Sequence, residues 1–190
     1  MGFPLSLNNQ RRWSGIKPLP TNQDADIGRM PNLRDNSVNQ DNAGVIAWPP
    51  LIFAVCVGMG IVVHFVHAVP IASGPVIRWL GGCLAVCSAA LAIWAVRVMK
   101  AAGTNVKPDQ PTLVIVKRGP YRLTRNPMYL SLCLLQIGIS LLLNDWIALL
   151  PVLVLFMTLH FGVVLREEAY LERKFGEQYL ELKRSVRRWI

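Results

Sequence analysis

Charged residues are scarce in this sequence, and its cysteines are too few for a disulfide scaffold. Only 16% of the 190 residues are Asp, Glu, Lys or Arg, whereas 53% are hydrophobic and the mean hydropathy is +0.36. A soluble domain of this size seldom combines these values, so the apolar surplus must face a lipid bilayer. The same apolar content excludes disorder of the whole chain.

The sequence also lacks the residue clusters that bind metals. Cys83 and Cys87 share a helix face, but no His or second Cys pair accompanies them. All the cysteines lie inside apolar runs, at positions 56, 83, 87 and 133. We therefore expect them to pack against other apolar side chains, and we expect no metal.

Residues 1–44 differ from the rest of the chain because they are polar and show no apolar periodicity. This composition predicts a disordered N-terminal tail, followed by a membrane domain at residues 45–190. The stretch from Met1 to Trp13 lacks the apolar core of a secretory signal. Because the tail holds five Lys or Arg and four Asp, nothing in it indicates binding to nucleic acid.

Four apolar runs predict an all-α membrane protein. The first, Pro49 to Val69, has 21 residues without Lys, Arg, Asp or Glu, and such a helix spans roughly 30 Å. The second runs from about Val76 to Met99. The third and fourth, Pro127 to Leu143 and Trp146 to Leu165, are separated by two residues and predict a tight helical hairpin.

Small residues recur along the second run at spacings that let another helix backbone approach closely. They are Gly81, Gly82, Ala85, Ser88, Ala89 and Ala92.

The distribution of Lys and Arg predicts the orientation of the four spans. The tail has five, the segment from Arg97 to Arg125 has seven, and the C-terminal segment from Arg166 has seven. The first short connection has only Arg78, and the second has none. Because positive residues mark the cytoplasmic face, we expect both termini in the cytoplasm, in a bacterial inner membrane.

The C-terminal segment from Arg166 to Val186 has apolar residues spaced four, four, three and four apart, with charges between them. This pattern predicts an amphipathic cytoplasmic helix. Gly176 lies in its middle and indicates a bend or a close contact.

Two polar stretches at the predicted cytoplasmic border are candidate binding sites. Asn126 and Pro127 suit the N-cap and first position of the third span, beside Arg122 and Arg125. A helix N-terminus with this flank can receive a carboxylate or phosphate, although the same residues suit an ordinary positive flank.

The second stretch is Arg166-Glu167-Glu168, at the exit of the fourth span. A carboxylate there can bind a cation, although acidic residues also simply complement the dipole at a helix start. An anion receptor and a cation receptor on neighbouring helix ends together suit a zwitterionic amino-acid group. His160, seven residues before Glu167, would share its face on a regular helix.

These motifs resemble the integral-membrane methyltransferases of the isoprenylcysteine carboxyl methyltransferase and phospholipid methyltransferase group. The resemblance covers roughly residues 45–190. The matching residues are Gly103-Thr104, Pro108, Leu113-Val114, Gly119-Pro120-Tyr121-Arg122, Arg125-Asn126-Pro127-Met128-Tyr129, Glu167-Glu168, Phe175-Gly176, Tyr179 and Val186-Arg187-Arg188.

The resemblance implies S-adenosyl-L-methionine as methyl donor and a lipophilic or small molecule as acceptor. Asn126 stands where many members have His, and Val163 where the eukaryotic prenylcysteine enzymes have Arg. Carried over by motif, the donor site consists of Leu113, Val114, Ile115, Val116, Tyr121, Asn126, Pro127, Met128, Tyr129 and Glu167.

The candidate catalytic residues depend on the acceptor. Arg125 or Arg166 would hold a carboxylate or thiolate, whereas Glu167, Glu168 or His160 would accept a proton from an amine. Two other functions remain open: an NADPH-dependent membrane reductase of the sterol-reductase type, and a four-helix scaffold or transporter without enzymatic activity.

Overall fold

The computed structural model describes residues 43–190, so nearly all of the expected tail lies outside the described residues. The described part is helical and contains no strand beyond one bridge, between Pro70 and Asp145. Its elements are α1 (Pro49–Val66), α2 (Val76–Ala101), η1 (Gly119–Arg122), α3 (Pro127–Leu143), η2 (Ile147–Leu149), α4 (Leu150–Leu159), η3 (His160–Val164), α5 (Leu165–Phe175) and α6 (Glu177–Ser185).

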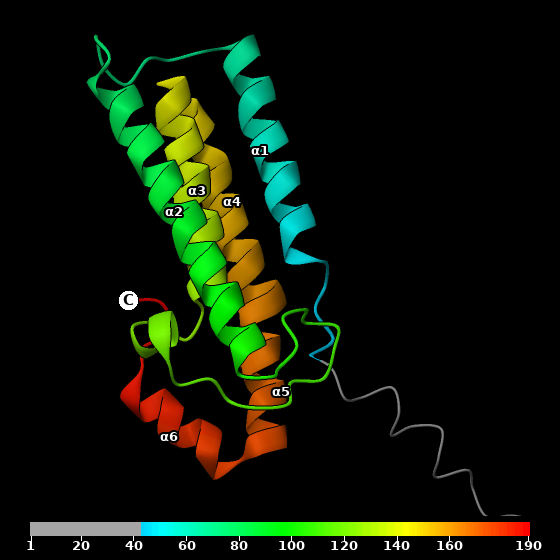
Figure 1. Cartoon of the computed structure of the whole chain (residues 1–190). Helices are drawn as coiled ribbons and strands as arrows, with labels where there is room; N and C mark the ends of the chain where they lie inside the picture. Colours follow the sequence, from blue (N-terminus) through cyan, green and yellow to red (C-terminus); the bar gives the residue numbers. More distant parts are fainter. Residues whose placement is uncertain (1–42) are drawn as a thin grey trace, which may run out of the picture. The chain divides into compact units, whose positions relative to one another are not determined.

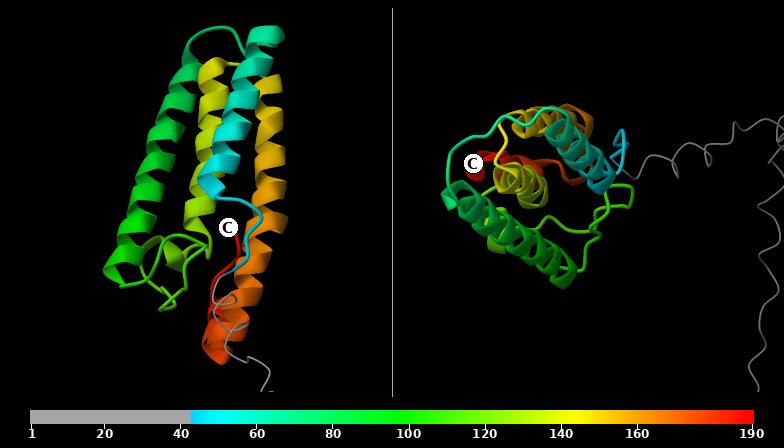
Figure 2. Two further views of the ribbon diagram at one scale, coloured as in Figure 1. Left: turned by 90° about the vertical axis from the view of Figure 1, so that its right-hand side faces the viewer. Right: turned by 90° about the horizontal axis from the view of Figure 1, so that it is seen from above.

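Helices α1 to α4 lie side by side in a bundle, as Figures 1 and 2 show. Three helical stretches are long and apolar enough to cross a membrane, namely α1, α2 and the continuous Ile147–Phe175. Helix α3 is also apolar but has only 17 residues. The predicted all-α membrane fold is therefore confirmed, with three of the four predicted spans long enough to cross a membrane.

The two short connections meet at one end of the bundle (Figure 1). Asp145 is fully buried there. Its Oδ1 accepts bonds from the backbone N–H of Val69 and Ile147, and its Oδ2 lies 2.9 Å from His64 Nδ1. The two-residue break between the third and fourth runs is thus a buried junction that joins the ends of α1, α3 and α4.

Helix α2 packs on α3 with almost no side chain between the two backbones. A Cβ added at Gly81 would lie 2.7 Å from the carbonyl oxygen of Gly138 and 2.6 Å from the backbone N of Leu142. A Cβ at Gly138 would lie 2.9 Å from the backbone N of Ala85. The close approach expected from the small residues of the second span is therefore present.

The amphipathic C-terminal segment consists of two helices instead of one. Gly176 has φ 52° and ψ −125°, a left-handed backbone that ends α5 and starts α6. Helix α5 continues α4 beyond the bundle, and α6 turns back across its end (Figure 1). This corner places α6 beside the loop between α2 and α3.

The α2–α3 contact gives a first prediction. Gly81→Ala and Gly138→Ala each force a methyl group against backbone atoms, so each should lower the free energy of unfolding by about 1–3 kcal/mol. Thermal unfolding in detergent measures this. Gly58→Ala in α1 is the control, since a Cβ there meets nothing within 4 Å. Unchanged unfolding of both variants would contradict the close approach.

Candidate functional site

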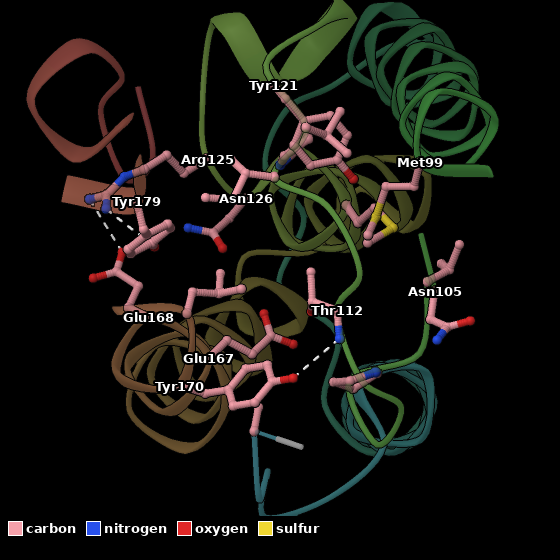
Figure 3. Close-up of a pocket in the computed structure, with 18 of the residues that line it drawn as sticks. Met99, Asn105, Thr112, Tyr121, Arg125, Asn126, Glu167, Glu168, Tyr170 and Tyr179 are labelled. Atoms are coloured by element: carbon pink, nitrogen blue, oxygen red, sulfur yellow. Dashed lines mark hydrogen bonds and ion pairs between the residues drawn. The ribbon is translucent and has the colours of Figure 1, made fainter. Parts of the chain in front are cut away.

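A pocket lies at the end of the bundle opposite the two short connections (Figure 3). It has an empty volume of about 870 Å³, part of it open to solvent. Its walls come from the end of α2, the loop after it, η1, the start of α3, and helices α5 and α6. Segments far apart in the sequence therefore line one cavity.

Glu167 projects into this pocket from the first turn of α5 (Figure 3). The hydroxyl of Tyr129, on α3, donates a hydrogen bond of 2.5 Å to its Oε1. No Lys, Arg or His of the described residues forms an ion pair with Glu167. The pocket thus contains a carboxylate with a hydrogen bond but no cationic side chain to compensate it, which favours a cationic ligand.

The adjacent Glu168 has the opposite environment. Its Oε1 lies 3.2 Å from Arg125 Nη2, and it receives two further bonds from Arg188, at 2.9 and 2.8 Å. Both the Glu168 and Arg125 side chains are more than nine-tenths buried, at 7% and 8% exposure. Glu168 is therefore a compensated carboxylate between two guanidinium groups.

Two residues that line the pocket each have a buried polar atom without a hydrogen-bond partner among the described residues. These atoms are the hydroxyl of Tyr121 and the Nε of Arg125. Burial, together with the nearby Glu167 carboxylate, raises the pKa of Tyr121 above its ordinary value, so its hydroxyl keeps its proton. Because buried polar groups are normally paired, both atoms indicate a polar ligand.

Most of the residues assigned to the donor site by resemblance line this pocket. They are Val114, Ile115, Val116, Tyr121, Asn126, Pro127, Met128, Tyr129 and Glu167, and Arg125 and Glu168 line it as well. Leu113 does not line it; its side chain is exposed, and its backbone N–H bonds Thr104 Oγ1. Arg166 lies outside as well, where its Nη1 donates to the carbonyl of Gly44.

Asn126 occupies the N-cap of α3 and Pro127 the first position, as the sequence predicts. The Asn126 side chain, however, does not bond to the helix. Its Nδ2 donates to the carbonyl of Arg188 at 3.0 Å, because the C-terminal residues return to this helix end. The first N–H groups of α3 consequently have no side-chain cap.

Sequence reasoning missed part of the wall. Tyr170 follows Glu167 by three residues and so shares its helix face, a signal that could have found it. Tyr179 is part of the motif with Phe175-Gly176 that carries the family resemblance, but the resemblance does not assign it to the donor site. Met99, Asn105 and Thr112 have no local signal, because only the course of the chain after α2 brings them to the pocket. The missed residues include Met99, Asn105, Thr112, Tyr170, Leu171, Tyr179 and Leu182.

His160 does not line the pocket. It begins η3, a π-helical turn, and the wider turn shifts the helix phase by about 100° between His160 and Glu167. The ring of His160 instead stacks on Phe156 and accepts a hydrogen bond from Trp189 Nε1 at 3.2 Å. The expected shared face therefore does not form.

Comparison with known proteins agrees with this site. A family model described as phospholipid methyltransferase matches residues 76–178, more than half of the chain. The chain belongs to this family. The matched residues include α2, the loop that borders the pocket, α3 and α5. The resemblance predicted from the motifs is thus confirmed, and membership indicates a membrane methyltransferase.

One relative is similar over a shorter stretch. It is an uncharacterized protein of Haemophilus influenzae, 41% identical over 63 residues. The match covers 33% of this chain and 100% of that protein.

The unpartnered hydroxyl of Tyr121 gives a second prediction. Tyr121→Phe removes a buried group that has no partner, so it should stabilise the ligand-free protein by about 1 kcal/mol. Tyr170→Phe is the matched control, because the Tyr170 hydroxyl accepts a bond from the Thr112 N–H and its loss should destabilise by a similar amount. Thermal unfolding without ligand compares the two. Destabilisation by Tyr121→Phe would show that its hydroxyl already has a partner.

Proposed function

We propose that this protein transfers a methyl group from S-adenosyl-L-methionine to an acceptor at the cytoplasmic face of a bacterial inner membrane. The observation that carries the proposal is the arrangement of charge in one pocket. The lining includes Glu167, an uncompensated carboxylate, together with Tyr121 and Arg125, each of which has an unpartnered donor among the described residues.

The residues fit the chemistry of this donor. Its methionine part carries an ammonium, a carboxylate and a sulfonium, so it needs groups of both signs within one site. Glu167 would bind the positively charged part of the donor. Arg125 Nε and the N–H groups at the start of α3, which have no side-chain cap, would bind the carboxylate of the donor. Apolar residues such as Val114 and Met128 would contact the rest of the molecule.

The bound donor supplies a methyl group that is already activated. The protein must therefore mainly align the two reactants and exclude water, and orientation alone can supply roughly 7–11 kcal/mol. A site with a single uncompensated carboxylate is sufficient for this task.

The orientation follows from charge. The end of the bundle with the two short connections has a single Lys or Arg, Arg78 in the first turn of α2, whereas the segments at the pocket end carry most of the positive residues. The positive-inside rule then supports a pocket and a C-terminus in the cytoplasm. The acceptor would reach the pocket from the cytoplasm or the inner leaflet.

An amine acceptor fits the charges of the pocket better than a carboxylate. Arg166 lies outside the pocket, and Arg125 contacts Glu168 and is assigned to the donor carboxylate, so neither would hold a carboxylate of the acceptor. Before the transfer, Glu167 would face the positive charge of the donor. After the transfer, it would face the positive charge of the methylated ammonium. It would then accept the proton that the new ammonium releases.

Ligand binding tests the donor directly. At about 100 times its dissociation constant, S-adenosylhomocysteine should stabilise the detergent-solubilised protein by roughly 2.7 kcal/mol, because it binds the folded state only. Titration followed by thermal unfolding measures the shift. NADPH serves as the comparison, and a shift with NADPH alone would favour the reductase instead. A protein that responds to neither would be the scaffold or transporter.

Glu167→Gln and Tyr129→Phe should each weaken binding of S-adenosylhomocysteine roughly ten-fold, about 1.4 kcal/mol. The first removes the negative charge, and the second removes the hydrogen bond that orients it. Calorimetric titration of the purified variants gives the dissociation constants. Glu177→Gln on α6 is the control, since its side chain is 65% exposed and outside the pocket. Equal losses in all three would exclude the proposed pocket.

A further inference from the structure

The last residues of the chain return to the pocket after α6 ends. Val186 has an extended backbone, with φ −129° and ψ 133°. The carbonyl of Arg187 then accepts a bond from the backbone N–H of Arg125 at 3.0 Å. The carbonyl of Arg188 accepts bonds from Thr124 Oγ1 and Asn126 Nδ2, both at 3.0 Å. We call residues 187–190 the C-terminal clamp.

The clamp is also attached to the membrane helix. Trp189 donates to His160 Nδ1, and its ring lies 5.0 Å from that of Phe156. Because an indole N–H only donates, the Nδ1 of His160 is an unprotonated acceptor in this contact. The clamp thus connects the loop before α3, which borders the pocket, with α4 and η3, which are distant from it in sequence.

The side chain of Arg188 reaches Glu168 from the clamp. Its Nε and Nη2 form a two-point contact with the two carboxylate oxygens, at 2.9 and 2.8 Å. Arg125 approaches the same carboxylate, at 3.2 Å from Nη2 to Oε1. Glu168 has one negative charge for two guanidinium groups, so Arg188 takes the stronger two-point contact and Arg125 is held by a single, longer one.

This division determines what Arg125 can do. Its backbone is held by the clamp, and the side chain lines the pocket. Its Nη2 contacts Glu168, its Nη1 donates to the Tyr179 hydroxyl at 3.5 Å, and its Nε is buried without a partner among the described residues. Without Arg188, the full charge of Glu168 would be available to Arg125, and a guanidinium favours a two-point contact with a carboxylate. The Arg125 guanidinium would then turn further toward Glu168 and would no longer be available to a ligand.

We propose that Arg188 is a positioning residue, which occupies Glu168 from the C-terminal clamp so that Arg125 faces the carboxylate of the methyl donor. This inference rests on the proposed function, because it assigns a role within the same donor site. Arg188 itself does not line the pocket, so its effect must pass through Glu168 and Arg125.

Arg188→Gln in the full-length protein tests the proposal. We expect binding of S-adenosylhomocysteine, measured by calorimetric titration, to weaken about ten-fold. Arg188→Lys should recover part of this loss, because it restores the charge but not the two-point contact. Arg184→Gln is the control, since it removes the same charge from an exposed pair with Glu177 on α6. Arg188→Lys also provides the measurement if Arg188→Gln does not fold.

A double-mutant cycle with Glu168→Gln distinguishes positioning from a general loss of stability. If Arg188 acts through Glu168, the double variant should bind no more weakly than the weaker single variant. Additive losses, or the same loss in Arg184→Gln, would overturn the positioning role. Wild-type affinity in Arg188→Gln would also overturn the positioning role, but it would leave the proposed function intact. Absence of binding in the wild type would overturn the proposed function itself.

Discussion

The contact between α2 and α3 is the constraint on which the rest of this structure depends. Gly81 and Gly138 allow the two backbones to meet, and a methyl group at either position would clash with main-chain atoms. In a bilayer, where apolar burial does not drive helices together, such close packing is a main source of association. The other ends of the same two helices carry residues of the pocket, Met99 on α2 and Tyr129 on α3. Gly119 extends the same packing to η1, which lies against Trp94 and Val98 of α2.

Two adjacent glutamates have different roles because successive residues of a helix point about 100° apart. Glu167 faces the pocket and has the Tyr129 hydroxyl as its partner. Glu168 faces the C-terminal clamp and has two guanidinium partners. A buried charge is costly unless it is compensated, so Glu168 serves the architecture while Glu167 remains available to a cationic ligand. A single residue step along α5 thereby separates a structural carboxylate from a candidate binding group.

The π-helical turn η3 shows how a local irregularity changes the site. It frees the carbonyl of Gly162 to accept a bond from the backbone N–H of Ile46, at 3.3 Å. This hydrogen bond connects the segment before α1 to η3. The same turn places His160 against Trp189 instead of beside Glu167. In a regular helix the imidazole of His160 would lie closer to the pocket. The clamp would then lose its hydrogen bond from Trp189 to His160.

Most of the helices and the family could be recognised from the amino-acid sequence alone. Apolar runs and helix caps depend on neighbouring residues, so the bounds of α3, Pro127–Leu143, could be predicted without error. The motifs around Asn126 and Glu167 likewise indicated a donor site, and most of those residues line one pocket. Local periodicity carries this information because each residue's environment repeats along its own helix.

Which polar groups are paired and which are open depends on the folded chain. The clamp supplies Arg188 to Glu168 and a backbone carbonyl to Asn126, from 20 and 62 residues away, and His64 near the end of α1 contacts Asp145. Such contacts leave no periodic signal, since they depend on where helices end and turn back. The glycine corner at residue 176 and the π-helical turn set those directions. Charge compensation in this pocket is therefore a property of the folded chain, because it requires groups that meet only after folding.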